Sequence, residues 1–197
     1  KLKVFDNKIF VINQDNRLLC LDVKNGTKLW DVRFVSSFVK SQYLLSIAIS
    51  EEGDLVMLNS SGDLIKMNAL NGKLHWSLNA TGTSSSHDSD FFKSSDVVIS
   101  DEDIILSTSS SIFSFNLYSG YLNWTKNISS RSAPIINGKY IFLVTEDGYF
   151  VNLDKNSGKI IWSTNILKTL KKSWKLFLEK KHITRITGFI MGSGKIY

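Results

Sequence analysis

Few residues in this sequence have the type and spacing that catalysis or metal binding requires. The three histidines, His75, His87 and His182, are far apart, and none stands at metal-ligand spacing from another histidine or from the single cysteine, Cys20. We interpret them as surface or loop residues. Cys20 has no second cysteine with which to form a disulfide, and its apolar neighbours place it in a strand. These residues predict no catalytic site, no metal site and no cofactor.

Two acidic clusters are the remaining candidates for cation binding. The cluster 101–103 lies where other parts of the sequence have turn residues, so we interpret it as a hairpin turn. Asp88 and Asp90 lie in a long polar segment, 79–95, without the evenly spaced oxygen ligands of a calcium loop. This segment is either a solvated loop or a partner-binding loop. The second interpretation is favoured by its length and by the aromatic pair that starts at Phe91.

Composition points to a folded all-β protein. Of the 197 residues, 43% are hydrophobic and 21% are charged, which is enough apolar material for a sizeable core. Pro134 is the single proline, and the predicted turns contain Gly, Asn, Asp and Ser, as in proteins with many short hairpins. No apolar stretch reaches the length of a membrane span. The net charge of +6 would permit contact with nucleic acid or an anionic membrane, but charge alone does not assign a function, and we predict no nucleic-acid partner.

One motif occurs four times without a gap and decides the fold class. It reads Asp/Asn, two residues, Asn/Ser, Gly, three residues, Trp. Successive tryptophans are 46, 48 and 38 residues apart, a spacing in the range of four-stranded propeller blades. The four copies are Asp22, Asn25, Gly26, Trp30; Asn68, Asn71, Gly72, Trp76; Asn116, Ser119, Gly120, Trp124; and Asp154, Ser157, Gly158, Trp162.

Alternating apolar residues precede each motif in fixed register and predict the strands of each blade. Leu19 and Leu21, for example, stand three places and one place before Asp22, and a turn former and another apolar run lie upstream. With one more short apolar run, each unit has four strands. We predict a partial β-propeller over 1–197, with blades over about 1–34, 44–78, 96–128 and 133–165 and the start of a further blade over about 186–197.

The chemistry of the motif explains the residue types that recur. Asp or Asn can accept hydrogen bonds from the backbone two residues on, and Gly accepts the positive φ that ends the turn. The tryptophan then lies on the outer strand, where its large ring can pack against the next blade. We therefore predict that Trp30, Trp76, Trp124 and Trp162, with Gly26, Gly72, Gly120 and Gly158, dock neighbouring blades.

The Gly-x-x-x-Trp repeat distinguishes between propeller families. Trp30-Asp31 is a Trp-Asp pair, but Trp76-Ser77 and the other two copies are not, and no Gly-His pair opens the blades as in WD40 repeats. The repeat resembles that of quinoprotein dehydrogenases, whose rings typically carry eight blades. The resemblance implies that the four blades are about half of a ring. Open blade faces at both ends then predict self-association.

Among non-enzymatic propellers, the sequence is similar to the lipoprotein B subunits of the bacterial outer-membrane β-barrel assembly machinery. The similarity includes Ser132-Ala133-Pro134 before Asn137-Gly138, and the stretch 162–170. It implies a scaffold rather than an enzyme. The scaffold would lie at the periplasmic face of the outer membrane, lipid-anchored in the intact protein, and would bind the POTRA domains of the barrel-inserting subunit through inter-blade loops. Unfolded outer-membrane proteins are a further implied partner.

The same resemblance implies contact residues. An apolar and basic contact maps near Phe38, Val39 and Lys40, and an acidic contact pair maps near Asp88 and Asp90, or about three residues later, beginning at Phe91. The alternative to a scaffold is a quinone- and calcium-dependent dehydrogenase, which often carries a pair of adjacent cysteines that this sequence lacks. A eukaryotic lumenal sensor with a similar propeller is a third alternative, favoured only by glycosylation sequons.

A basic connection follows the fourth blade. Ile166, Leu170 and Trp174 recur at helical spacing, with lysines largely on the other side, and predict a short amphipathic helix over about 166–180. The helix would either cap the ring with a solvated lysine face or meet an anionic partner or membrane surface.

Overall fold

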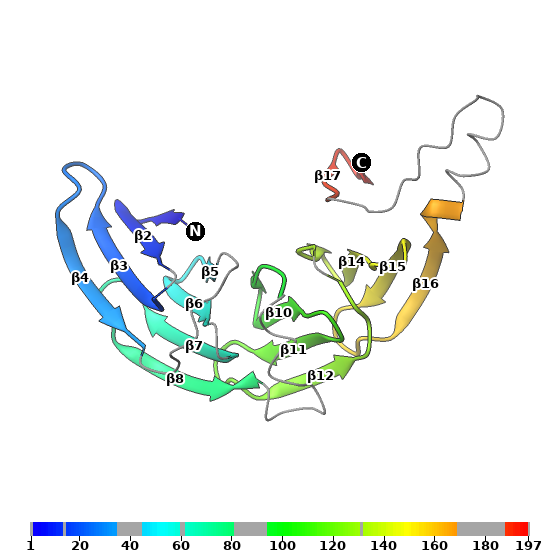
Figure 1. The fold of residues 1–197 in the computed structure, drawn as a ribbon, viewed down its shortest axis with the longest axis horizontal. Helices are drawn as coiled ribbons and strands as arrows, with labels where there is room; N and C mark the ends of the chain where they lie inside the picture. The colour runs from blue at the N-terminus through cyan, green and yellow to red at the C-terminus, as the bar shows by residue number, and fades with distance from the viewer. Residues whose placement is uncertain are drawn as a thin grey trace.

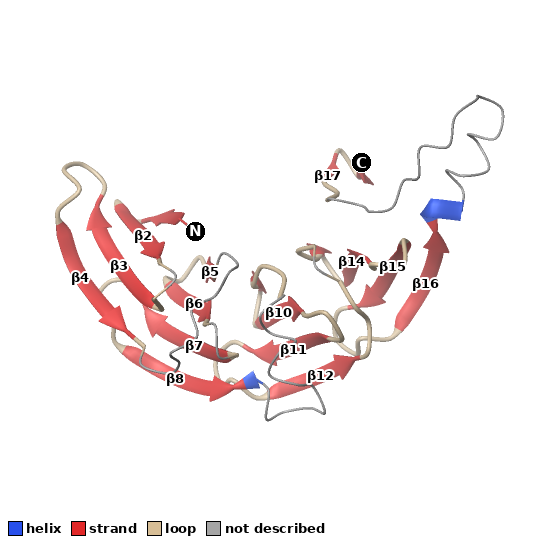
Figure 2. Ribbon diagram, viewed as in Figure 1, coloured by secondary structure: helices blue, strands red, loops and turns tan. Residues whose placement is uncertain are grey.

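The computed structural model describes residues 2–13, 15–34, 45–59, 62–80, 94–130, 132–168 and 188–196. These residues form four four-stranded sheets and one two-stranded sheet. In each four-stranded sheet the strands are antiparallel and lie side by side in sequence order. The predicted all-β fold of four-stranded antiparallel blades is therefore confirmed (Figure 2).

The blades are numbered along the chain. Blade 1 comprises β1 (Leu2–Phe5), β2 (Lys8–Ile12), β3 (Arg17–Asp22) and β4 (Lys28–Arg33). Blade 2 comprises β5 (Ser46–Ile49), β6 (Asp54–Leu58), β7 (Asp63–Asn68) and β8 (Leu74–Asn79). Blade 3 comprises β9 (Val98–Ser100), β10 (Asp103–Ser107), β11 (Ile112–Asn116) and β12 (Leu122–Lys126). Blade 4 comprises β13 (Ile135–Asn137), β14 (Tyr140–Val144), β15 (Tyr149–Asp154) and β16 (Ile160–Asn165).

The blades stand beside one another along an open arc, with the outer strands β4, β8, β12 and β16 on its convex side (Figure 1). Blade 1 and blade 4 lie at opposite ends of this arc. A separate hairpin, β17 (Met191–Gly192) with β18 (Lys195–Ile196), lies where the sequence predicts the start of a further blade.

The outer strand of every blade carries one irregularity at the same place. In blade 1, Trp30 pairs with Cys20 and Lys28 pairs with Leu21, so Leu29 is an extra residue directly before the tryptophan. The other three blades repeat this bulge before their own tryptophans. A bulge adds local twist and redirects a side chain, so each tryptophan is turned in the same way relative to its blade.

The hydrophobic core consists of three clusters, one at each junction between consecutive blades. At the first junction, alternate residues of blade 1 such as Phe10 and Leu18 meet alternate residues of blade 2 such as Met57 and Ile65. Each blade thus has a forward face, toward the next blade, and a rear face, toward the preceding one. Successive side chains along a strand point to opposite faces of the blade. Because both faces of blades 2 and 3 are packed against a neighbouring blade, apolar residues occupy both, and their strands are nearly continuous hydrophobic runs in the sequence.

Only the beginning of the predicted helix falls within the described residues. Residues 166–168 are helical, and the rest of the predicted span, 169–180, lies outside the described part of the chain. Within that described part, no helix has the length and apolar character needed to cross a membrane.

Candidate functional site

The turn before each tryptophan is built from its own side chains. In blade 1, Asp22 Oδ1 accepts hydrogen bonds from the backbone nitrogens of Lys24 at 2.8 Å and Asn25 at 3.2 Å. The backbone nitrogen of Gly26 donates to Asp22 O at 2.9 Å, and Gly26 has a φ of +71°. The first polar residue of the other three motifs does the same. The turn thereby holds the following tryptophan at a constant distance and orientation.

Each of the first three tryptophans lies against the motif glycine of the next blade. A Cβ placed on Gly72 would lie 2.9 Å from Cε3 of Trp30, and one placed on Gly158 would lie 2.5 Å from Cε3 of Trp124. On Gly120 it would lie 3.2 Å from Cδ2 of Trp76. Glycine therefore serves two needs at these positions, the left-handed backbone and the space that the indole fills.

The indole nitrogens complete the junctions with hydrogen bonds that cross from blade to blade. Trp30 Nε1 donates to Leu70 O at 3.1 Å, Trp76 Nε1 to Leu117 O at 3.2 Å, and Trp124 Nε1 to Lys155 O at 2.8 Å. The accepting carbonyl is always one or two residues after the Asp/Asn of the motif. Each of these three tryptophans thus joins the apolar core of one blade to the turn of the next.

Among the described residues, Trp162 and Gly26 have no such neighbour. Trp162 contacts the rings of Phe142 and Phe150 within its own blade, and the residue is 41% exposed. A Cβ on Gly26 would meet no atom within 4 Å. These two residues are the outermost ends of the series of junctions.

A lysine crosses the junction between blades 3 and 4. Lys155 of blade 4 forms ion pairs with Asp101 and, at 3.5 Å, with Asp103 of blade 3. The hydrogen bond and charge of Lys155 hold the pKa of Asp101 below its ordinary value. Burial raises the pKa of Asp103 despite the lysine. Burial alone would lower the pKa of Lys155, but the hydrogen bond and charges of the two aspartates raise it.

A second buried lysine lies at the preceding junction. Lys66 of blade 2 pairs with Asp54 at 2.8 Å, and its Nζ lies 5.1 Å from the centroid of the Tyr118 ring in blade 3. His75 Nε2 is 3.9 Å from Asp54. In the described part of the chain, no group of three or more His, Cys, Asp or Glu side chains is placed to hold a metal ion.

Sequence reasoning missed both lysines. The signal for Lys66 was its position between Ile65 and Met67, because a charge that interrupts an apolar strand needs a buried partner. Lys155 follows directly after the motif aspartate, Asp154, where the other motifs have an apolar residue, and that departure was the signal. Asp101 was correctly interpreted as a turn residue, but its partner 54 residues away could not be read from spacing.

The predicted partner-binding residues lie in two inter-blade loops that fall outside the described residues. These residues are Phe38, Val39 and Lys40 in the first loop, and Asp88, Asp90 and Phe91 in the second. The structure does describe where the loops begin. The backbone nitrogen of Phe34 donates to Asn16 O at 3.1 Å, and that of Ala80 donates to Gly62 O at 2.9 Å.

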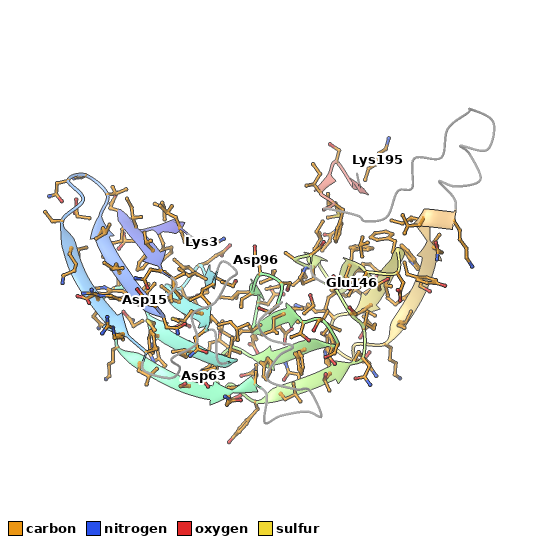
Figure 3. The ribbon with its side chains drawn as sticks, viewed as in Figure 1. Lys3, Asp15, Asp63, Asp96, Glu146 and Lys195 are labelled. Atoms are coloured by element: carbon orange, nitrogen blue, oxygen red, sulfur yellow. The ribbon has the colours of Figure 1, made fainter. Side chains whose placement is uncertain are left out.

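The far ends of the two loops are also fixed. Leu45 is buried in the core of the first junction, and the backbone nitrogen of Val97 donates to Ser46 Oγ of blade 2 at 2.7 Å. Both loops run from an outer strand to the next inner strand, so in antiparallel blades they start and finish at one end of the propeller. Carboxylates labelled in Figure 3 belong to the same end, namely Asp15, Asp63, Asp96 and Glu146.

Comparisons with known proteins agree with this architecture. The family model described as outer membrane protein assembly factor BamB matches residues 1–164. No curated protein sequence matches. Among solved structures, BamB from Moraxella catarrhalis is similar with a TM-score of 0.62 and 13% sequence identity, over 83% of this chain and 47% of that one.

Other propellers are similar at the level of the fold. The quinohemoprotein alcohol dehydrogenase from Comamonas testosteroni has a TM-score of 0.69 and 12% identity, over 83% of this chain and 34% of that one. The computationally designed Ika8 protein has a TM-score of 0.67 and 13% identity, over 99% of this chain and 53% of that one.

The chain thus spans about half or less of the length of each of these structures. At such low identity, structural likeness shows the fold alone. The family model is the more specific finding, because it covers the four repeats and the turns and tryptophans that join them. The chain belongs to the family of the outer membrane protein assembly factor BamB.

Proposed function

We propose that this protein is a non-enzymatic scaffold subunit of the outer-membrane β-barrel assembly machinery. The observation that carries the proposal is the match of the BamB family model over residues 1–164. The architecture is suited to a scaffold, because blades joined by apolar junctions and partly buried tryptophans hold the ends of their connecting loops in fixed positions. The intact protein would act at the periplasmic face of the outer membrane, held there by a lipid anchor.

The partner surface in this proposal is the end of the propeller that carries the two long inter-blade loops. Phe38, Val39 and Lys40 would supply an aromatic, an aliphatic and a basic contact, a combination typical of protein interfaces. The ordered ends of the first loop, at Phe34 and Leu45, support this assignment. A loop anchored at both ends loses less conformational freedom when it binds a partner.

The second loop would extend this surface to the next junction. Asp88 and Asp90 would add negative charge, and Phe91 would add an aromatic anchor. The carboxylates on the neighbouring hairpins, Asp63 and Glu146, belong to the same end of the molecule. A partner with an apolar patch beside basic residues would therefore fit. We assign this role to the POTRA domains of the barrel-inserting subunit, with unfolded outer-membrane proteins as a further partner.

A binding measurement with purified POTRA domains tests the proposal. The triple variant Phe38→Ala, Val39→Ala, Lys40→Ala is expected to weaken binding by about tenfold or more, because central aromatic and basic contacts dominate interface energy. The matched control changes one aromatic, one aliphatic and one basic exposed residue of the opposite end, Tyr121→Ala, Leu70→Ala and Lys73→Ala. Equal binding by both variants would contradict the site assignment, and absence of binding by the wild type would contradict the partner.

The competing dehydrogenase hypothesis makes a separate prediction. A quinone-dependent enzyme would raise its melting temperature when quinone and calcium are added together, because a ligand that binds only the native state stabilises it. With an oxidisable alcohol supplied as the electron donor, it would also oxidise that alcohol and pass the electrons to an electron-accepting dye. We expect neither effect, and either one would argue against the scaffold role.

A further inference from the structure

Asparagine is followed directly by glycine at three places, Asn25-Gly26, Asn71-Gly72 and Asn137-Gly138. The backbone nitrogen of such a glycine, once it has lost its proton, can attack Cγ of the asparagine, because glycine has no side chain to obstruct the approach. All three asparagines are exposed, so water and hydroxide reach each of them. The three sites differ in their hydrogen bonds.

The first two pairs are held inside the turns that precede the tryptophans. The backbone nitrogen of Gly26 donates to Asp22 O at 2.9 Å. Asn25 Oδ1 accepts from the backbone nitrogen of Thr27 at 2.9 Å and from its hydroxyl at 2.8 Å. The turn around Asn71 repeats the bond of the glycine nitrogen and the backbone bond to the asparagine side chain. A hydrogen-bonded amide loses its proton only when the bond opens, as in hydrogen exchange, so the fold protects both pairs.

The third pair lies in a different kind of turn. Asn137 ends β13 and pairs with Tyr140, so Gly138 and Lys139 form the two-residue loop of a hairpin. Among the described residues, no acceptor binds the backbone N–H of Gly138, and no group bonds to the side-chain amide of Asn137. Neither reacting group therefore has a hydrogen bond that must open first.

We propose that Asn137 is a site of spontaneous deamidation in the folded protein, and that its isoaspartate product loosens the junction between blades 3 and 4. Hydroxide removes the proton of the Gly138 nitrogen, which attacks Asn137 Cγ. As the new N–Cγ bond forms, the side-chain nitrogen leaves and takes a proton from water, which gives ammonia and regenerates the hydroxide. A five-membered succinimide remains.

Water then opens the succinimide at one of its two carbonyl carbons. Opening at Cγ gives aspartate, and opening at the main-chain carbonyl carbon gives isoaspartate. The sum of the steps is asparagine plus water to aspartate or isoaspartate plus ammonia, with no oxidant or reductant. Aspartate leaves the main chain unchanged, whereas isoaspartate adds a methylene group to it. Because a two-residue loop has a geometry matched to its strands, the added methylene must shift the loop.

The loop reaches the junction through Lys139, whose carbonyl accepts from the backbone nitrogen of Lys155 at 2.9 Å. The Lys155 carbonyl in turn accepts from Trp124 Nε1 at 2.8 Å. The Lys155 side chain forms the ion pairs with Asp101 and Asp103. One residue thus carries polar contacts from blade 4 to blade 3, and the loop that holds its backbone contains the modification site. A shift of this loop is expected to open the backbone bond of Lys155 and weaken the junction.

Peptide mapping by mass spectrometry, after incubation of the native protein at mildly alkaline pH, tests the site. Deamidation of Asn137 is expected to be faster than that of Asn25 or Asn71 by about tenfold or more. In concentrated urea the three rates are expected to converge, since glycine follows each asparagine. Equal rates in the native protein, or an advantage of Asn137 that is undiminished in urea, would overturn the assignment.

Hydrogen exchange at the backbone amide of Lys155 tests the effect on the junction. Exchange is expected to be about tenfold or more faster in the isoaspartate form than in fresh wild type. Freshly purified Asn137→Asp has the charge of the aspartate product without the added methylene, and its exchange at Lys155 is expected to match the wild type.

Asn137→Gln controls for the incubation itself, because its longer side chain would have to close a six-membered ring and is expected to form no isoaspartate. Circular dichroism verifies that both variants are folded. Unchanged exchange at Lys155 in a sample that contains isoaspartate, or the same increase in Asn137→Asp, would overturn the proposed effect on the junction.

Discussion

Gly72 shows how a single position decides whether two blades can meet. Its φ is +71°, and an added Cβ would lie 2.9 Å from the Trp30 ring. We predict that Gly72→Ala costs about 1–2 kcal/mol for the left-handed backbone and a further 1–3 kcal/mol or so for the displaced indole. Chemical denaturation measures the loss.

The comparison variant for Gly72 is Gly138→Ala. Gly138 also has a positive φ but open space around the Cβ position. Its substitution by alanine is therefore expected to cost only the free energy of placing a Cβ-bearing residue in the left-handed conformation. An equal loss of stability in both variants would show that the indole contact contributes nothing.

At the scale of the residue, the ion pairs of Asp31 make the free energy of unfolding depend on pH. Its carboxylate accepts from Lys28 Nζ at 2.7 Å and Arg17 Nε at 2.8 Å, and these bonds lower the pKa of Asp31 from its ordinary value of 3.8. Because the folded pKa is the lower one, the stabilisation is complete above pH 3.8 or so and is lost as the pH falls through the folded pKa.

We therefore predict that Asp31→Asn is less stable than the wild type at pH 7 and that the difference shrinks below about pH 4. Urea denaturation at a series of pH values measures this. Asp147→Asn, in an exposed turn, controls for the loss of one negative charge. A difference between Asp31→Asn and the wild type that stays constant down to pH 2 would contradict the ion-pair explanation.

At the scale of the element, the tryptophan strand joins the blades through both its ring and its indole hydrogen. Trp124→Phe keeps an aromatic ring but leaves the Lys155 carbonyl without its donor. An unsatisfied buried acceptor costs about 1–3 kcal/mol. Trp162→Phe removes an indole hydrogen that no described carbonyl accepts.

We expect Trp124→Phe to lower the free energy of unfolding by at least about 1 kcal/mol more than Trp162→Phe does. The measurement uses dilute, monomeric samples, so that association between chains does not contribute. Similar losses from the two substitutions would mean that the hydrogen bond across the junction is not a stabilising element.

At the scale of the whole molecule, the described residues of the blades form a linear array in which consecutive blades pack against each other. The strands of blades 2 and 3 are covered on both faces, whereas Val11 and Leu19 of blade 1 are partly exposed. Stability in such an array is approximately a sum of blade and junction terms, and the end blades open first.

Hydrogen exchange followed by mass spectrometry should therefore show the slowest exchange in β6, β7, β10 and β11, with faster exchange in the backbone amides of β2 and β3. The hydrogen bonds between the two central strands are equivalent in these blades. The expected difference in exchange rate therefore reflects whether one or both faces of the blade are covered by a neighbouring blade. Uniform protection across the blades of a monomeric sample would contradict the linear description and indicate a single cooperative unit.

Much of the fold could be predicted from sequence because its determinants are local. Asp22 and Gly26 form a turn within five residues, and the alternation of Leu19 and Leu21 predicts a strand. Each copy of the repeat therefore contains the residues that determine its own local structure. The glycine contacts with tryptophan follow from the same repetition. The partner loops are different: they have no repeated pattern, and their contact residues were inferred only from resemblance to a family.

The sequence by itself determined the all-β fold of four-stranded antiparallel blades, because the same motif and the same alternation of apolar residues occur four times. Only the tertiary structure decided which groups meet across a junction. Lys155 reaches Asp101, and Lys66 lies over the ring of Tyr118, because of the rotation between adjacent blades, which spacing along the chain does not encode. The same holds for Trp162 and Gly26, whose equivalence to the joined pairs was visible in the repeat but whose exposure was visible only in the folded arc.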